Sequence, residues 1–327
     1  MLRILVVRID FLGDMVCTTA FIHALKQRWP EAEIHVLANK YNMSVLAHNP
    51  DITTVHTYVY SKQCERNQRP GRLNALIDRI ALIWRLRGLH FDMAIIPNGG
   101  MNKNSIQFIR QLNIADSRWH NEQSEFDDRV ASHVANRPIK HEALSGFSLM
   151  PELASVDPSS LRLHVYPSLP LQHKWCEWFG EKSKPRVGLF ISNKSADRRW
   201  DWQKWLDTMK ALQEKAELYI FHDPAEKPTE EQLAHLPVRC LSTPTVNDLI
   251  AAMSQLDLVI SADSAPVHLG AALRIPTVAL FENRPEKYLR WYPLGVPHIL
   301  LHEGTQVADI KSQSVIDAAT HLLDCVA

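Results

Sequence analysis

The chain has 327 residues and no net charge, because 36 Lys and Arg residues balance 36 Asp and Glu residues. This balance argues against a dedicated nucleic-acid-binding protein, which needs a basic excess to neutralise phosphates. The five cysteines are scattered and lack zinc-site spacing, as expected for reduced thiols in the cytoplasm. The N-terminal apolar run is much shorter than the about 20 residues that cross a bilayer, and it lacks the features of a signal peptide. We therefore expect a cytoplasmic protein, and its length suggests two domains.

Strands and helices alternate through the first half of the chain. Runs of aliphatic and β-branched residues predict buried strands at 4–9, 33–38, 53–58 and 93–97. Apolar residues at helical spacing predict a helix that follows the first strand through about Arg28 and stops before Pro30. A second helix is predicted over 71–89, and its apolar side consists of Leu73, Leu76, Ile77, Ile80, Ile83 and Trp84. The initial strand, helix and strand indicate a doubly wound sheet.

The same alternation restarts after a proline-containing connection at 151–184, in which we expect one short helix. Strands are predicted at 185–191, 216–221, 256–261 and 277–281. Helices are predicted at 202–215, 247–255, 265–273 and 312–325. Two α/β halves predict two Rossmann-like domains, 1–165 and 166–327, that face each other across a cleft. Ligands of such sheets bind at the carboxyl ends of the strands.

The common nucleotide and hydrolase motifs are absent from the sequence. Neither first strand is followed by G-x-G-x-x-G, and the chain has only 11 glycines. No P-loop, G-x-S-x-G or H-E-x-x-H motif occurs either. These absences disfavour a dehydrogenase, an NTPase, a serine hydrolase and a zinc enzyme, and we expect no metal site.

Two carboxylates follow the first predicted strand, in the segment R-I-D-F-L-G-D-M at 8–15. Asp10 and Asp14 are therefore expected at the carboxyl end of the sheet. Asp14, at the start of the helix, allows two interpretations. It can cap the helix N terminus, or it can act as a general base that takes the proton of an acceptor hydroxyl. Gly13 beside it would let the backbone approach a substrate closely.

The second half contains a strand, a turn and a helix in the segment D-L-V-I-S-A-D-S-A-P-V-H-L-G at 257–270. Pro266 fits the first helical turn, and Asp263 and Ser264 are expected to cap it. The N terminus of such a helix favours a diphosphate. Asp263 would be repelled by that diphosphate, so sugar hydroxyls are its natural partner. His268, one turn into the helix, is either a buried structural residue or part of the site.

Cations and one more carboxylate follow other strands of this half. The segment S-N-K-S-A-D-R-R-W at 192–200 brings Asn193 and the cations Lys194, Arg198 and Arg199 to the end of its first strand. Such cations can neutralise a phosphate leaving group without a metal, although a solvated loop is the alternative. Glu226, in H-D-P-A-E at 222–226, could bind ribose hydroxyls.

Residues 61–90 hold two acidic residues against seven basic ones, which are Lys62, Arg66, Arg69, Arg72, Arg79, Arg85 and Arg87. A solvated helix face is the ordinary interpretation of such a segment. The sharper interpretation is contact with an anionic acceptor or with an anionic membrane surface.

These segments together resemble glycosyltransferase family 9, the ADP-heptose:lipopolysaccharide heptosyltransferases. The resemblance covers the opening I-L-V-V-R-I-D-F-L-G-D-M-V-C-T-T-A-F-I-H-A-L-K, then W-P-E-A-E-I-H-V-L, and then D-L-V-I-S-A-D-S-A-P-V-H-L-G-A-A-L-R-I-P-T-V-A-L-F. The R-R-W at 198–200 is similar to the family's K-x-W. The resemblance implies a GT-B fold and an inverting transfer without metal or cofactor. It also implies ADP-heptose as donor and lipid A-linked core oligosaccharide as acceptor, with the enzyme cytoplasmic or peripheral on the inner membrane.

The resemblance also assigns roles to individual residues. Asp14 matches the catalytic aspartate of the family, Arg198 its diphosphate-binding lysine and Glu226 its ribose-binding acidic residue. The expected donor-binding residues are Asn193, Lys194, Arg198, Glu226, Asp263, Ser264, Ala265 and His268. The expected acceptor-binding residues are Asp10, Gly13, Arg66, Arg69 and Arg72. A sugar-nucleotide epimerase of the same fold and a non-catalytic nucleotide-sugar-binding protein remain as alternatives.

Overall fold

The computed structural model describes residues 1–120, 140–233 and 235–326. The chain divides into two compact units, Met1–Tyr166 and Pro167–Ala327, and each unit is built around its own parallel sheet. Among the described residues no helix is long and apolar enough to cross a bilayer.

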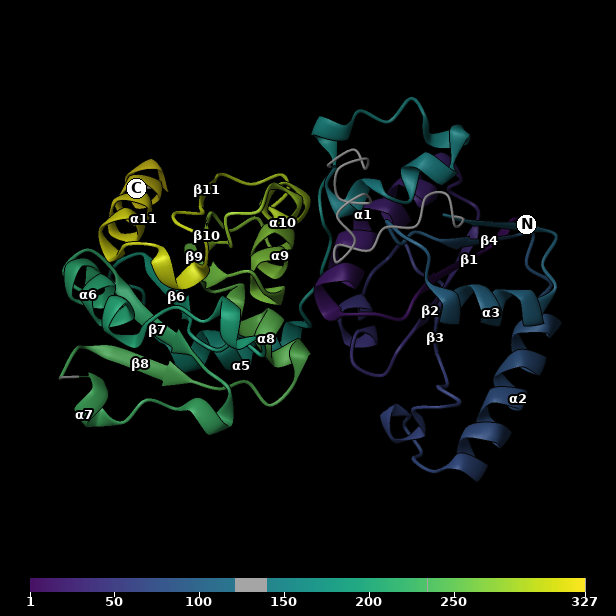
Figure 1. Cartoon of the computed structure of the whole chain (residues 1–327), viewed down its shortest axis with the longest axis horizontal. Helices are drawn as coiled ribbons and strands as arrows, with labels where there is room; N and C mark the ends of the chain where they lie inside the picture. The colour runs from purple at the N-terminus through teal and green to yellow at the C-terminus, as the bar shows by residue number, and fades with distance from the viewer. Residues whose placement is uncertain (121–139, 234, 327) are drawn as a thin grey trace. The chain divides into compact units, whose positions relative to one another are not determined.

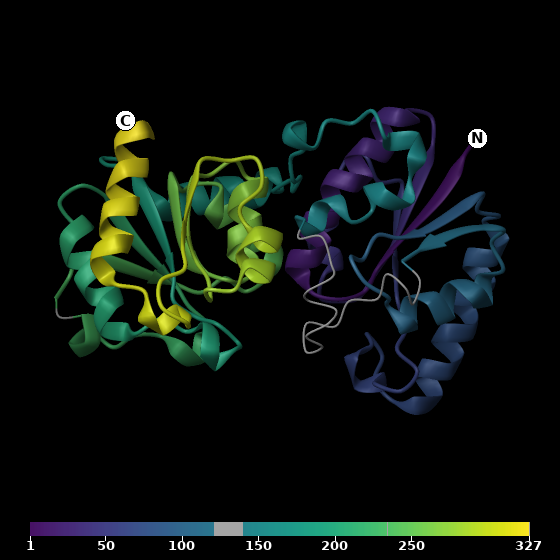
Figure 2. The same cartoon turned by 45° about the horizontal axis from the view of Figure 1, so that its top comes forward.

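The N-terminal unit contains a five-stranded sheet in the order β3-β2-β1-β4-β5. Its strands are β1 (Arg3–Arg8), β2 (Glu33–Ala38), β3 (Thr54–Thr57), β4 (Met93–Ile96) and β5 (Asp116–Trp119). Its α-helices among the described residues are α1 (Leu12–Arg28), α2 (Arg72–Gly88) and α3 (Lys103–Leu112). Figures 1 and 2 show α1 on one face of this sheet and α2 and α3 on the other. The core under α2 and α3 is aliphatic and aromatic, which provides the hydrophobic stabilisation of this unit.

The C-terminal unit contains a six-stranded sheet in the order β11-β10-β9-β6-β7-β8. Its strands are β6 (Arg186–Phe190), β7 (Glu217–Phe221), β8 (Val238–Leu241), β9 (Leu258–Ala262), β10 (Thr277–Leu280) and β11 (His298–Leu301). Its helices are α5 (Leu169–Phe179), α6 (Trp202–Leu212), α7 (Glu230–Leu233), α8 (Val246–Met253), α9 (Ala265–Ala272), α10 (Pro285–Trp291) and α11 (Ser312–Val326). Helices α6 and α11 pack together and contribute residues to one hydrophobic core cluster of this unit.

The order of strands reverses beside the first strand of each unit. In the N-terminal unit the reversal lies between β1 and β4, and in the C-terminal unit it lies between β6 and β9. All pairings between neighbouring strands are parallel, so the carboxyl ends of these strands share one edge of each sheet. Segments that are distant in sequence therefore meet at this edge, which is where open α/β sheets bind ligands.

Helix α2 forms where its periodicity predicts it, but its larger apolar side does not face the sheet. The buried residues of the helix are Ala75, Leu82 and Leu86. Five of the six apolar residues predicted to share one side are exposed, and only Ile83 packs against the core. The core therefore accepts the minor apolar face of this helix.

Candidate functional site

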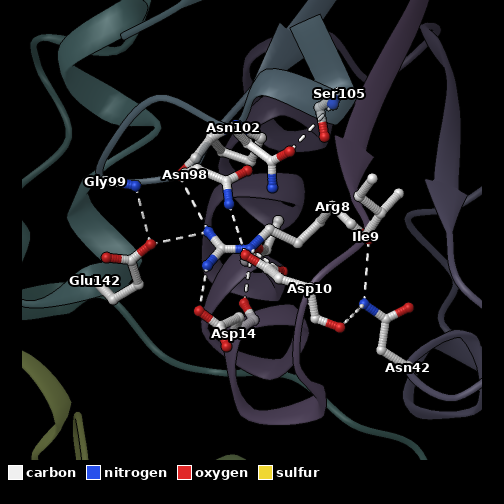
Figure 3. A network of polar contacts seen from close by, with 12 residues as sticks. Arg8, Ile9, Asp10, Asp14, Asn42, Asn98, Gly99, Asn102, Ser105 and Glu142 are labelled. Atoms are coloured by element: carbon white, nitrogen blue, oxygen red, sulfur yellow. Dashed lines mark hydrogen bonds and ion pairs between the residues drawn. The ribbon is translucent and has the colours of Figure 1, made fainter. Parts of the chain in front are cut away.

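A buried arginine at the end of β1 organises the candidate site of the N-terminal unit (Figure 3). Arg8 is 1% exposed, and its guanidinium donates to three carboxylates. Its Nε lies 2.7 Å from Asp10 Oδ1, its Nη2 2.5 Å from Asp14 Oδ1, and its Nη1 2.9 Å from Glu142 Oε1. The rigid fork of a guanidinium holds such acceptors at fixed positions. Arg8 therefore orients three acidic side chains from two distant parts of the chain.

The segment after β4 completes this network. Asn98 Nδ2 donates to Asp10 Oδ2 at 2.6 Å, and Gly99 N donates to Glu142 Oε1 at 3.0 Å. Figure 3 shows these groups gathered around the guanidinium of Arg8. Because β1 and β4 flank the reversal of strand order, the network occupies the ligand-binding position of the sheet.

Asp14 differs from an ordinary carboxylate in its pKa. Burial, and then the charge of Asp10, raise the pKa of Asp14 from 3.8 to about 7, although Arg8 acts to lower it. For Arg8, burial acts to lower the pKa, but the three carboxylates raise it well above its ordinary value. The Asp14 side chain is still 15% exposed. The guanidinium therefore stays charged while Asp14 can exchange a proton near neutral pH, as suits a general base.

Asp14 does not cap helix α1. The N-cap residue is Phe11, and Asp14 is the third residue of the helix. Its carboxylate bonds to Arg8, so the capping interpretation is wrong. The charge nevertheless lies in the first turn, where the helix dipole favours an anion.

Three of the expected acceptor-binding residues lie beside the end of β1. Asp10 follows the strand, and Gly13 lies in the first turn of α1. The guanidinium of Arg66 stacks over the Tyr60 ring at 4.8 Å from its centre, and the Tyr60 hydroxyl donates to Ile9 O at 2.6 Å. These contacts bring Arg66 close to the segment that carries the two aspartates.

The other two expected acceptor-binding residues lie at the start of α2. Arg69 forms an ion pair with Asp78, and Arg72 is the exposed first residue of the helix. In the described structure no contact connects Arg69 or Arg72 with Asp14. Arg69 and Arg72 therefore add positive charge to the same unit without contacting the site.

In the C-terminal unit, Asn193 connects the segments that follow β6 and β9. Asn193 Nδ2 donates to Asp263 O at 3.2 Å, and Asn193 Oδ1 accepts from Ser195 N at 3.0 Å. Arg199 Nε donates to Asn193 O at 2.9 Å. The loop after β6 is thus tied to the turn before α9, again where the strand order reverses.

Arg198 forms an ion pair with that turn. Its Nη1 lies 3.2 Å from Asp263 Oδ2, and its Nε lies 3.7 Å from Glu282 Oε1. Burial raises the pKa of Asp263, which is 8% exposed, while the charges of Arg198 and Lys287 act to lower it. The Arg198 side chain is 32% exposed, so it can also reach an incoming anion.

The N terminus of α9 is not capped by the side chains that we expected. Ser264 occupies the N-cap position, but its hydroxyl donates to Ala262 O at 3.0 Å and makes no cap. Asp263 is paired with Arg198 instead, so the capping prediction is wrong for both. Ala265 and Pro266 begin the helix. Without a side-chain cap, the positive end of this helix is available to an anion.

The remaining expected donor-binding residues have different surroundings. Glu226 accepts from Arg199 Nη2 at 2.6 Å, and Lys194 is exposed. His268 is 4% exposed, and its ring packs edge-on against Trp291 with centroids 5.7 Å apart. His268 therefore lies in the interior of this unit.

Sequence reasoning missed Arg8, Asn98 and Glu142 as parts of the N-terminal site, and Glu282 in the C-terminal unit. For Arg8 a signal was present, because a charge at the end of an apolar strand needs partners when buried. Glu142 lies in the short 3₁₀ turn Glu142–Leu144, and its sequence has no pattern that points to the first strand.

Comparisons with known proteins agree with one another. A sequence model of glycosyltransferase family 9 (heptosyltransferase) matches residues 79–318. Lipopolysaccharide heptosyltransferase 3 of Escherichia coli is 22% identical over 285 residues, covering 83% of this chain and 81% of that protein. The glycosyl transferase family 9 structure from Veillonella parvula has a TM-score of 0.80 at 18% identity, covering 98% of this chain and 97% of that chain. The E. coli heptosyltransferase WaaC, solved with ADP-2-deoxy-2-fluoro heptose, has a TM-score of 0.73 at 15% identity, covering 98% of this chain and 99% of that chain.

The family match extends over well more than half of the chain, from within α2 to within α11. The structural similarity extends over nearly all of it and confirms the predicted GT-B fold class. The chain therefore belongs to glycosyltransferase family 9, the heptosyltransferase family, and is a glycosyltransferase.

Proposed function

We propose that this glycosyltransferase moves a heptose from ADP-heptose onto a hydroxyl of the lipid A-linked core oligosaccharide of lipopolysaccharide. We further propose that the transfer inverts the anomeric configuration and needs neither metal nor cofactor. The names of the relatives and the ADP-linked fluoroheptose of WaaC support the choice of substrates. The observation that carries the proposal is the Asp14 carboxyl, which Arg8 holds at the ligand-binding edge of the sheet and whose pKa is raised to about 7.

In this mechanism Asp14 accepts the proton of the acceptor hydroxyl while the hydroxyl oxygen attacks the anomeric carbon. The new glycosidic bond forms as the bond from that carbon to the diphosphate oxygen breaks. ADP leaves with the bonding electron pair, the sugar configuration is inverted, and the proton stays on Asp14. A base with a pKa near the working pH is well matched to this step. Arg8 keeps the carboxylate oriented, and Asp10 and Gly13 are proposed to contact the acceptor.

The leaving diphosphate is assigned to the N terminus of α9, at Ser264 and Ala265. The uncapped amide end of the helix and the guanidinium of Arg198 supply positive potential there. Lys194, which is exposed on the loop after β6, is proposed to join them. Donors and cations that are already in place stabilise negative charge as it develops on the leaving group.

The sugar and the ribose are assigned to the acidic residues of the same unit. Asp263 is proposed to orient the heptose hydroxyls, and Glu226 to bind the ribose. Asn193 connects Asp263 to the loop after β6, so it would hold the sugar-binding turn in place. His268 is assigned to the donor site through its position in α9.

The acceptor side is assigned to the N-terminal unit. Arg66, Arg69 and Arg72 form an exposed cationic segment that suits acceptor phosphates. We place the enzyme in the cytoplasm, in peripheral contact with the inner membrane, because its proposed acceptor is lipid-linked.

The test is a transfer assay with ADP-heptose, UDP-sugars and GDP-sugars on lipopolysaccharide core acceptors, with and without a chelator. We expect transfer from ADP-heptose with inverted configuration by NMR, and no effect of the chelator. Asp14→Asn should lower turnover by roughly 10²–10⁴-fold while it retains ADP binding by calorimetry. A preference for UDP or GDP donors would overturn the donor assignment. Near-normal turnover of Asp14→Asn would overturn the base, and conversion of the free sugar nucleotide without acceptor would indicate an epimerase.

A further inference from the structure

Helix α2 has two apolar faces on opposite sides. Ala75, Leu82 and Leu86 form the buried face, which packs on the core of the N-terminal unit. The helix lies on the outer side of its own unit, where Figure 1 draws it in blue. A helix that is apolar on both sides is unusual at a protein surface, because one face normally meets water with polar residues.

The outward face carries large hydrophobic side chains at high exposure. The exposed fractions are 78% for Leu73, 58% for Leu76, 59% for Ile77, 47% for Ile80 and 73% for Trp84. At 3.6 residues per turn these positions fall within one stripe about 100° wide. They make up half of the ten exposed large hydrophobic side chains among the described residues, so they form a patch and not a random scatter. We call these five residues the α2 stripe.

The α2 stripe is bordered by positive charge. Residues 61–90 hold seven Lys and Arg residues against two acidic ones, although the whole chain has no net charge. Arg72, Arg85 and Arg87 of the helix are exposed. Arg72 and Arg85 form no ion pair with a carboxylate in the described ranges. The combination of an apolar stripe and basic borders is typical of helices that lie in a membrane interface.

We propose that the α2 stripe docks on an anionic lipid bilayer, with the helix parallel to its surface. The aliphatic side chains enter the boundary between headgroups and acyl chains, and the indole of Trp84 lies at headgroup level. The arginines bind lipid phosphates, since basic residues next to an anionic leaflet add to the attraction. This inference deepens the proposed membrane contact and rests on the proposed function only for its lipid-linked acceptor.

Charge distinguishes this partner from a second copy of the chain. A twofold dimer would place the α2 stripe against itself, so the arginines of one copy would face those of the other. An anionic bilayer instead neutralises all of them at once. The structure therefore favours the lipid surface.

The experiment is vesicle flotation of the full-length protein. One vesicle type contains phosphatidylethanolamine with phosphatidylglycerol, and the other contains phosphatidylcholine alone. The apolar variant is Leu76→Ser with Ile77→Ser and Trp84→Ser, and the charge variant is Arg72→Gln with Arg85→Gln. All five side chains are exposed, so both variants should fold, which far-UV circular dichroism and thermal unfolding check.

We expect the wild type to float with the anionic vesicles, and less so as salt is raised. The apolar variant should partition on the order of a hundredfold more weakly. The charge variant should lose about fivefold per arginine on anionic vesicles only. The matched control is Leu169→Ser, which removes a side chain that is 70% exposed on α5 of the other unit and should change nothing.

Three results would overturn the inference. The first is a wild type that does not float with anionic vesicles, and the second is an apolar variant that floats equally well. The third is a dimer in light scattering that the apolar variant converts to a monomer, which would assign the stripe to a second copy. Loss of flotation with circular dichroism and thermal unfolding unchanged concerns this surface alone. Absence of heptose transfer with flotation intact would instead count against the proposed function.

Discussion

Replacing Asp10 by Asn is expected to lower the pKa of Asp14 and shift the acid limb of the pH–rate profile to lower pH. After burial, the charge of Asp10 is the largest influence that raises the pKa of Asp14 to about 7. Both carboxylates bind one guanidinium, at 2.7 and 2.5 Å, so they lie on the order of 5 Å apart. With an effective dielectric constant of about 20, Coulomb's law gives ~3 kcal/mol for their repulsion, or roughly two pH units. Arg8 lies between the two carboxylates and reduces this value, so we expect a shift of about 1–2 pH units.

The substitution fits the site because Asn98 can adapt to it. Asn98 Nδ2 now donates to Asp10 Oδ2, and Asn98 Oδ1 has no hydrogen-bond partner in the described structure. If the Asn98 amide turns over, its oxygen can accept from the nitrogen that the substitution introduces. The remaining oxygen at position 10 can still accept from Arg8 Nε. Asp10→Asn therefore removes a charge without leaving a cavity, and its cost is that the turned Asn98 nitrogen takes the buried position at which Asn98 Oδ1 now has no partner.

The assay is kcat/KM for heptose transfer from pH 5 to pH 9. Wild-type activity should rise with pH through about 7, as Asp14 loses its proton. Asp51→Asn is the control, because Asp51 is a buried carboxylate of the same unit that pairs with His23 at 2.8 Å, and its profile should match the wild type. Should turnover be too slow to profile, the NMR titration of the Asp14 carboxyl carbon reports the same pKa. An acid limb that stays near 7 in Asp10→Asn would refute the electrostatic argument.

Three further changes have outcomes that the structure predicts. Folding raises the pKa of Asp14 from 3.8 to about 7, so between these pH values the native state binds more protons than the unfolded state. The free energy of unfolding therefore falls as the pH rises from 3.8 to about 7, by ~4 kcal/mol at most. Urea unfolding at pH 5 and pH 8 should therefore show a smaller loss for Asp14→Asn than for the wild type, and equal losses would contradict the raised pKa. Arg198→Ala should weaken ADP binding in calorimetry by about tenfold or more. Arg198→Lys should weaken it less, since lysine keeps the charge but lacks the forked donors of the guanidinium. Unchanged affinity for ADP would remove Arg198 from the donor site. Gly146→Ala should destabilise the N-terminal unit by ~1–3 kcal/mol, because its Cβ would meet Phe21 Cγ at 2.8 Å. The control is Gly88→Ala, because the added Cβ has open space around it. In thermal unfolding Gly88→Ala should stabilise the unit by up to ~1 kcal/mol. Equal effects of the two substitutions would count against the packing argument.

The interior strands of both sheets were predictable from the sequence, whereas several edge elements were not. Strands such as β1 and β9 are buried on both faces and read as continuous aliphatic runs. Strand β5, with the sequence D-S-R-W, is half-buried at an edge and has no apolar pattern. Strand β8 is a similar edge, and α3 between β4 and β5 was also missed. Edge strands need only one apolar side, and a short strand offers too few positions to reveal it.

Helix α2 shows that periodicity predicts a helix better than it predicts which side is buried. The stripe with the larger side chains was visible in the sequence, yet the sheet packs on Ala75, Leu82 and Leu86. The choice depends on the space between α2, α3 and the sheet, which is a property of the whole unit.

At the candidate site the sequence by itself determined which groups stand at the ends of the strands. Asp10 and Asp14 follow β1, and Asp263 and Ser264 follow β9, because the end of a strand and the start of a helix are local features. Only the tertiary structure brought Glu142 to Arg8, which is 134 positions away in the chain, and it alone raised the pKa of Asp14. Burial and the distances between charges depend on segments that meet only when the sheet has formed, so no local pattern encodes them.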